Sequence, residues 1–170
     1  MMKIFETQLS GILRKLNKSE MDIEDAARVT AQSILSDGKV YAAASPELGG
    51  IVSQAVHGTD AVPECNRLEK DTVLSSLDTV WVFTARVEDT EAEIRAVQEA
   101  GASLVLVLPE AYGHELEQAA SFLIETHVTR PLIPVESGER IGEPHLLVSL
   151  HIYYALFFQL HEILEEHEEM

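Results

Sequence analysis

Three short apolar runs, separated by helical patterns, constrain the fold of this chain most strongly. Residues 39–44 (KVYAAA), 79–84 (TVWVFT) and 104–108 (LVLVL) are continuously apolar rather than alternating, which is typical of strands covered on both faces of a parallel sheet. The segment 89–100 between the last two runs has a helical pattern that ends at Gly101. Strands that alternate with helices in this way predict right-handed βαβ units and a doubly wound α/β fold.

Weaker segments complete the predicted core. They are a helix at 46–56, a strand at 62–65, a helix from about Lys70, a helix at 113–120 and a last strand at either 122–126 or 132–135. We therefore expect a mainly parallel, five-stranded sheet flanked by helices, a three-layer arrangement of the flavodoxin or Rossmann type. A length of 170 residues fits one such domain.

Helical patterns precede and follow this core. Apolar residues at helical spacing predict a helix over 4–16, and Ser19 is a favourable N-cap for a second helix that runs to about Leu35. The expected domain has three parts, which are N-terminal helices at 1–36, an α/β core at 37–136 and a C-terminal helix at 142–168.

The C-terminal helix has almost no polar face over residues 146–160, and a helix that is apolar all round must be buried all round. One interpretation is a second subunit, which predicts a homodimer or tetramer formed through the terminal helices. The other is a central helix wrapped by the two N-terminal helices. The apolar run contains His151 and Gln159 and is shorter than the ~20 residues of a membrane span. With no basic-then-apolar leader, we expect a cytoplasmic protein that does not contact membranes.

The charge excludes one class of partner. The chain has 29 Asp and Glu residues against 12 Lys and Arg, a formal net charge of −17, so we expect no binding to nucleic acid or to an anionic membrane. The single cysteine, Cys65, allows neither an internal disulfide nor a structural zinc site. Phosphate-loop and dinucleotide-binding glycine motifs are absent from the sequence. We therefore expect no cofactor and no metal.

Two loops at the predicted carboxyl ends of strands carry candidate binding residues. In the first, Ser45 and Pro46 precede the helix 46–56, whose N-terminus offers free N–H groups to an anion. In the second, Thr84 supplies a hydroxyl and Arg86 a fork of donors suited to phosphate. Each loop also has a purely structural interpretation, in which Ser45 caps its own helix and Arg86 pairs with a neighbouring acid at the surface.

The order of elements resembles the sugar isomerase (SIS) domain family, in particular its phosphoheptose isomerase branch. The matching segments are 35–44 (LSDGKVYAAA) leading into Ser45, 79–86 (TVWVFTAR), and 143–147 (EPHLL) at the start of the C-terminal helix. The likeness covers nearly the whole chain as an order of elements, and its motifs are divergent. It implies the SIS fold and a small phosphorylated sugar as ligand, contacted by Ser45, Thr84, Arg86 and Thr90.

The resemblance also implies a reaction, the aldose–ketose isomerisation of sedoheptulose 7-phosphate, but the catalytic motif departs from the family. The family places a Glu on the helix after the first loop, whereas residues 49–58 contain no carboxylate. The catalytic His position falls on Leu150. Glu47 and His145 are the candidates for a relocated proton-transfer pair. The alternative is a non-catalytic sensor or regulatory module that uses the same fold.

Overall fold

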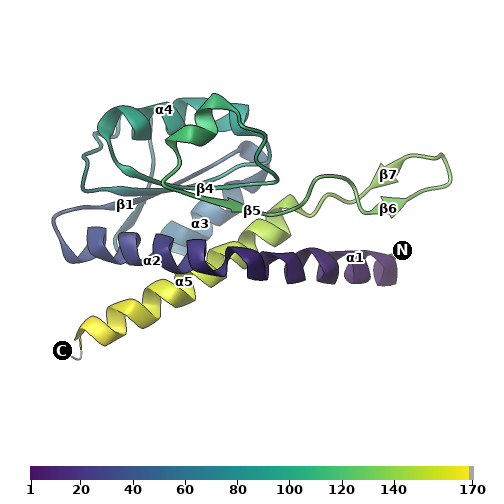
Figure 1. Cartoon of the computed structure of the whole chain (residues 1–170), viewed down its shortest axis with the longest axis horizontal. Coiled ribbons are helices and arrows are strands. Elements are labelled where there is room, and N and C mark those ends of the chain that lie inside the picture. Colours follow the sequence, from purple (N-terminus) through teal and green to yellow (C-terminus); the bar gives the residue numbers. More distant parts are fainter. Residues whose placement is uncertain (169–170) are drawn as a thin grey trace.

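The three apolar runs form the centre of one sheet in the computed structural model, which describes residues 1–168 (Figure 1). The strand order is β2-β1-β3-β4-β5, and all neighbouring strands are parallel. The register aligns Val40 with Thr79 and Thr79 with Ser103, so the carboxyl ends of the three central strands lie along one edge. The expected five-stranded parallel sheet is confirmed.

The elements have the following bounds. The α-helices are α1 (Met2–Lys15), α2 (Glu20–Leu35), α3 (Gly49–His57), α4 (Glu91–Ala100) and α5 (His145–Glu168). The strands are β1 (Val40–Ala44), β2 (Cys65–Arg67), β3 (Thr79–Phe83), β4 (Ser103–Leu108), β5 (Phe122–Glu125), β6 (Ile133–Pro134) and β7 (Arg140–Ile141). Short 3-10 helices are η1 (Leu16–Ser19), η2 (Pro46–Leu48), η3 (Val87–Thr90) and η4 (Glu115–Ala119).

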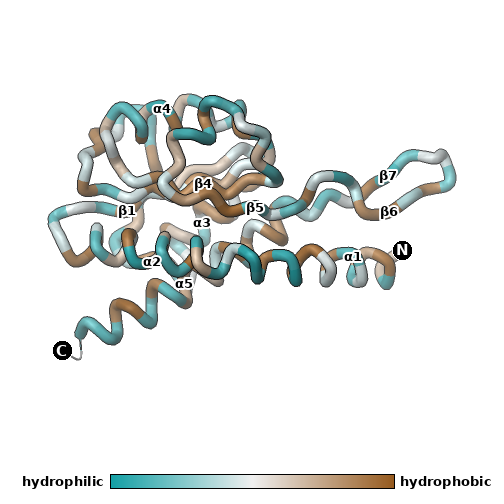
Figure 2. The backbone as a smooth tube through the Cα atoms, in the orientation of Figure 1, coloured by the Kyte–Doolittle hydropathy of each residue, from teal (hydrophilic) through white to brown (hydrophobic). Residues whose placement is uncertain are grey.

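Two hydrophobic cores cover the two faces of the sheet, because side chains alternate along each strand. In β3, Trp81 and Phe83 belong to the core formed with α2, α3 and α5, whereas Val80 and Val82 belong to the core under α4 and η4. All four are fully buried. Figure 1 shows α4 on one side of the sheet and α2, α3 and α5 on the other, and Figure 2 shows β4 and β5 as strongly hydrophobic. The doubly wound, three-layer architecture is therefore confirmed.

The segment between α3 and β3 departs from the prediction. The strand expected at 62–65 lies at Cys65–Arg67, because Pro63 has no N–H to donate and the Val62 N–H bonds to the Ala55 carbonyl at 3.0 Å. The helix expected from about Lys70 is wrong, since the structure has turns there. Those turns are held by side-chain bonds, among them the Asp78 carboxylate accepting from the Ser75 N–H at 2.7 Å. Cys65 is buried, and this burial raises the pKa of its thiol to about 12.

Of the two candidates for the last strand, 122–126 supplies β5, while 132–135 contributes to a separate antiparallel hairpin, β6–β7. Gly142 (φ +83°) ends the hairpin and lies against Phe5, whose Cδ2 is 3.6 Å from the position of an added Cβ. Figure 1 shows the hairpin and α1 extending from the body together. The N-terminal helix thus has a partner outside the three layers.

Helix α5 is not buried all round by this chain. It packs against α2 and α3 and buries Ile152 and Leu156, but Leu146, Leu147 and Phe158 are 43%, 47% and 55% exposed. Burial of these three side chains by a second subunit stays a prediction. The molar mass of the particle, measured by light scattering at micromolar concentration, would test whether the chain forms an oligomer. By length and composition alone, α5 is also long and apolar enough to cross a membrane, and 33% of its apolar stretch is buried. Core helices of soluble proteins share these properties.

Candidate functional site

A cleft of about 610 Å³ opens at the carboxyl ends of the central strands, the edge at which open parallel sheets bind ligands. Three of the predicted site residues line it, namely Glu47 after β1, Arg86 after β3 and His145 at the start of α5. The other three, Ser45, Thr84 and Thr90, are at most 1% exposed. The fold therefore brings half of the predicted set to one surface.

Ser45 ties the ends of two strands together. Its hydroxyl accepts a hydrogen bond from the Ala85 N–H at 3.2 Å, and its own N–H donates to the Phe83 carbonyl at 2.9 Å. Ser45 occupies the N-cap position of η2, yet its side chain makes no cap hydrogen bond. The hydroxyl thus serves the neighbouring loop and not its own helix.

The hydroxyls of Thr84 and Thr90 are used inside the second loop. Thr84 Oγ1 donates to the Arg86 carbonyl and accepts from the Arg86 N–H at 3.2 Å. Thr90 Oγ1 donates to the Val87 carbonyl at 3.2 Å. These bonds shape the loop, and a direct contact of either threonine, or of Ser45, with a ligand stays a prediction.

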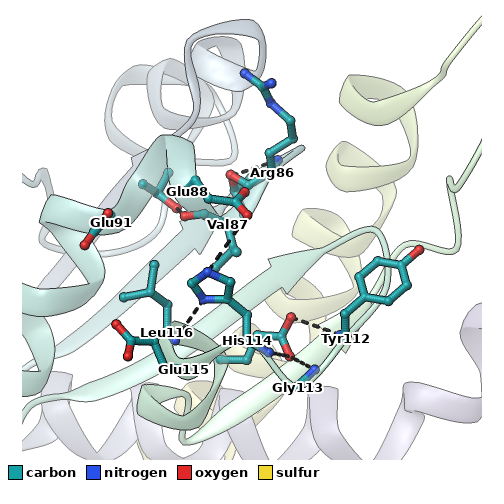
Figure 3. Close-up of polar contacts among 12 residues, drawn as sticks. Arg86, Val87, Glu88, Glu91, Tyr112, Gly113, His114, Glu115 and Leu116 are labelled. Atoms are coloured by element: carbon teal, nitrogen blue, oxygen red, sulfur yellow. Dashed lines mark hydrogen bonds and ion pairs between the residues drawn. The ribbon is translucent and has the colours of Figure 1, made fainter.

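Arg86 is exposed and paired within its own loop. Its Nε and Nη2 donate to the two Asp89 carboxylate oxygens at 3.1 and 3.0 Å, and this pairing is the main reason that the pKa of Arg86 is raised. Asp89 is thus engaged by Arg86, and the N-cap residue of α4, Thr90, makes no side-chain cap hydrogen bond. Figure 3 shows the guanidinium pointing away from His114. An exposed pair of this kind is weak and can exchange with a ligand.

The two candidate proton-transfer residues approach the cleft from different elements. Glu47 is exposed on η2, at the end of β1. His145 is 13% exposed, and its Nε2 lies 3.8 Å from Oε2 of Glu143. Both line the same cleft, so the fold meets the first requirement of a relocated pair, which is access to one ligand.

The loop that follows β4 was not predicted as part of the site, although it supplies a further wall of the cleft. His114 and Tyr112 line it, together with the buried Glu117. Glu117 accepts from the N–H groups of Tyr112, Gly113 and His114 at 3.1, 2.7 and 3.1 Å, and His114 Nδ1 accepts from the Leu116 N–H (Figure 3). The sequence signal for this arrangement is that Glu117 lies three residues after the helix N-cap, which is the spacing of a capping box.

The cleft is rich in hydrogen-bond acceptors. Its five carboxylates are Glu47, Glu88, Glu110, Glu117 and Glu143. Arg86 is the single Arg or Lys among the lining residues that the structure describes. The Tyr112 hydroxyl donates to Oε2 of Glu110 at 2.7 Å, which raises the pKa of that phenol. Within residues 1–168, no group of three or more His, Cys, Asp or Glu is placed to hold a metal ion.

Comparisons with solved structures place this geometry in a known fold. A hypothetical protein shares it with a TM-score of 0.70 and 13% identity, covering 98% of this chain and 89% of the other. The E. coli CFT073 protein c3406 in complex with arabinose 5-phosphate has a TM-score of 0.70 and 14% identity, and the match covers 96% of this chain and 89% of the other. A candidate phosphosugar isomerase from Silicibacter pomeroyi DSS-3 has a TM-score of 0.66 and 16% identity, and the match covers 91% of this chain and 48% of the other. The SIS-like fold expected from the sequence is confirmed by these likenesses.

Comparisons of sequence identify the family. The chain is 35% identical over 173 residues to the uncharacterized protein YwjG of Bacillus subtilis (strain 168), covering 98% of this chain and 99% of that protein. A family model described as a domain of unknown function, DUF2529, matches residues 1–164. The chain therefore belongs to the DUF2529 family.

Proposed function

We propose that the protein binds a small phosphorylated sugar in the cleft at the strand ends. The observation that carries this proposal is that Glu47, Arg86 and His145, from three distant segments, line one cleft. The cleft lies at the edge where parallel sheets bind ligands. The complex of the E. coli CFT073 fold neighbour with arabinose 5-phosphate supports the same class of ligand.

Arg86 is the proposed phosphate ligand. Its planar guanidinium already holds a carboxylate through two hydrogen bonds, and a phosphate presents oxygens at the same spacing with more charge. Binding would replace Asp89 by the phosphate. Glu47 and Glu88 add negative potential around Arg86, so the affinity depends on this one guanidinium.

The carboxylates of the cleft suit the sugar body. Glu47, Glu110 and Glu143 are exposed lining residues, and an ionised carboxylate accepts strong hydrogen bonds from hydroxyl groups. A polyol supplies many such donors. The acidic lining therefore favours a hydroxyl-rich ligand with a single anionic end over a ligand with several phosphates.

The proposed reaction is aldose–ketose isomerisation of the phosphoheptose type. It needs a base that takes the proton from the carbon next to the carbonyl and returns it to the neighbouring carbon. Glu47 is the proposed base, and His145 is the proposed acid that serves the sugar oxygens.

A second candidate function is a sugar-phosphate sensor without turnover, and one observation favours it. The N–H groups of Ala85 and Arg86 are bonded to the hydroxyls of Ser45 and Thr84. Donors that are already occupied cannot stabilise the negative charge that develops on a reaction intermediate, whereas the exposed Arg86 guanidinium is still able to bind a phosphate. A loop of this kind suits binding more than catalysis.

Calorimetric titration with arabinose 5-phosphate tests the binding site. In Arg86→Ala we expect the Kd to rise on the order of tenfold or more, because a charge-assisted contact is lost. Arg95→Ala is the matched control, since Arg95 is also exposed and paired with two carboxylates, those of Glu91 and Glu115, but lies outside the cleft. The absence of binding by wild type to arabinose 5-phosphate and sedoheptulose 7-phosphate at millimolar concentration would overturn the proposal.

Turnover separates the two candidate functions. An isomerase converts one of these sugar phosphates, and Glu47→Gln and His145→Ala each abolish the conversion while binding persists. A sensor binds the ligand and releases it unchanged. Conversion at the wild-type rate by both variants would remove Glu47 and His145 from the mechanism.

A further inference from the structure

The imidazole of His114 is held on both sides at the wall of the cleft (Figure 3). Its Nδ1 accepts a hydrogen bond from the Leu116 N–H at 3.2 Å, and its Nε2 lies 3.9 Å from Oε1 of Glu88, another lining residue. A backbone N–H only donates, so Nδ1 offers its lone pair and the proton of the neutral ring lies on Nε2. His114 therefore presents an N–H donor in a fixed tautomer.

Glu117 fixes the main chain that carries this ring. Glu117 is 8% exposed, and its carboxylate accepts from the N–H groups of His114, Gly113 and Tyr112 at 3.1, 2.7 and 3.1 Å. Bonds to a buried ionised acceptor are about twice as strong as neutral ones. The donor at His114 is thus positioned before any ligand arrives, which is the arrangement that stabilises developing charge most effectively.

Few side chains of the cleft offer a neutral hydrogen-bond donor. A carbonyl oxygen only accepts hydrogen bonds, whereas half of the polar lining side chains are carboxylates. Arg86 is bonded to Asp89 and points away from His114 (Figure 3). Among the lining residues that the structure describes, the other side chains with a donor are Tyr112, Thr129, His114 and His145. The Tyr112 hydroxyl already donates to Glu110 at 2.7 Å, and each histidine has Nε2 within 4 Å of a carboxylate oxygen. His114 is distinguished by the Leu116 N–H bonded to its Nδ1, which fixes the donor on Nε2.

We propose that His114 is a catalytic residue of this cleft, whose Nε2–H donates a hydrogen bond to the carbonyl oxygen of the open-chain sugar phosphate. This inference rests on the proposed function. When the carboxylate base takes the proton from the neighbouring carbon, that C–H bond breaks and its electron pair forms a carbon–carbon double bond. The π pair of the carbonyl moves to the oxygen, where the Nε2–H stabilises the charge.

The second half of the reaction restores every group. His145, the proposed acid of this cleft, carries the hydroxyl proton of the neighbouring oxygen to the oxygen held by His114. The carboxylic acid returns its proton to the former carbonyl carbon, and the new carbonyl forms on the neighbouring carbon. Atoms and electrons balance, and no oxidant or second substrate is required.

His114→Asn separates this role from the structural one. Asparagine is a preferred N-cap and keeps an acceptor for the Leu116 N–H, but it has no donor at the place of Nε2. We expect kcat for arabinose 5-phosphate isomerisation to fall by about a hundredfold or more, the usual effect of removing one such donor, with KM changed far less. His57→Asn, an exposed histidine at the end of α3, is the matched control and leaves both constants unchanged.

The outcomes distinguish this inference from the proposed function. A wild type that binds no sugar phosphate overturns both. A wild type that binds and converts the sugar, with His114→Asn equally active, overturns only the role of His114, as does binding without conversion. Imidazole nitrogen chemical shifts give an independent reading, since a proton on Nδ1 of the free protein would contradict the proposed tautomer.

Discussion

The loops that follow β3 and β4 line the same cleft, but they satisfy their main-chain groups in different ways. In the β3 loop, the hydroxyls of Ser45 and Thr84 accept from the N–H groups of Ala85 and Arg86. In the β4 loop, one buried carboxylate, that of Glu117, accepts from three consecutive N–H groups. In the first arrangement, the hydroxyls that the sequence predicts as ligand-binding groups already accept hydrogen bonds from the main chain.

The second arrangement leaves a side chain free for the cleft. Because Glu117 holds the main chain of the β4 loop, the Nε2 of His114 is not needed there and lies near Glu88, another lining residue. The exposed Arg86–Asp89 pair is the corresponding adaptable group of the β3 loop. In both loops, the groups that can face a ligand are those that the backbone does not need.

Glu117→Ala is the change with the largest expected effect, because it removes the acceptor of three N–H groups in a buried place. We expect the free energy of unfolding to fall by about 2–3 kcal/mol, measured by urea denaturation. Glu117→Gln, which keeps the size and one oxygen, is expected to lose less.

Glu115→Ala is the control for this change, since its side chain is 70% exposed and bonded to Arg95 at the surface. A wild-type stability for Glu117→Ala would show that the β4 loop does not depend on the carboxylate. It would also remove the basis for a fixed His114.

Ser45→Ala tests the β3 loop and has the next largest expected effect. The hydroxyl is fully buried, and its loss leaves the Ala85 N–H without its acceptor. We expect a loss of about 1–2 kcal/mol in urea unfolding. Ser53→Ala, at an exposed position of α3, is expected to change stability little. If Ser45→Ala instead weakened sugar-phosphate binding without loss of stability, the hydroxyl would be a ligand contact.

The sheet could be predicted because its signal is local. Continuous apolar runs at 39–44, 79–84 and 104–108 correspond to β1, β3 and β4 within a residue or so at each end, since burial on both faces leaves no polar position in the run. The segment from about Lys70 failed because its conformation depends on side-chain bonds such as that of Asp78, which no periodicity expresses.

The candidate site could be predicted only in part. A hydroxyl such as that of Ser45 is visible in the sequence, but its partner, the Ala85 N–H, lies 40 residues away and only the pairing of β1 with β3 brings them together. His114 was missed because the segment 113–120 reads simply as helical. The proposed role of His114 depends on the hydrogen bonds by which Glu117 caps the main chain. This cap geometry matters for function only because the loop faces a cleft.

Glu110→Gln gives the smallest expected effect and tests the exposed tip of the β4 loop. The hydrogen bond and the charge of Glu110 raise the pKa of Tyr112 above its ordinary value of 10.0, so the substitution should lower that pKa toward 10.0. Absorbance titration of tyrosinate measures it, with Tyr112→Phe subtracted because burial also raises the pKa of Tyr41 and Tyr153. Since the folded pKa is raised, the small stabilisation from this pair is present below pH 10.0 and is lost as the pH rises through the folded pKa. An unchanged pKa of Tyr112 in Glu110→Gln would mean that the tip of the loop moves freely in solution. The hydrogen bonds of Glu117 would then fix the main chain of the loop but not the side chain of Tyr112.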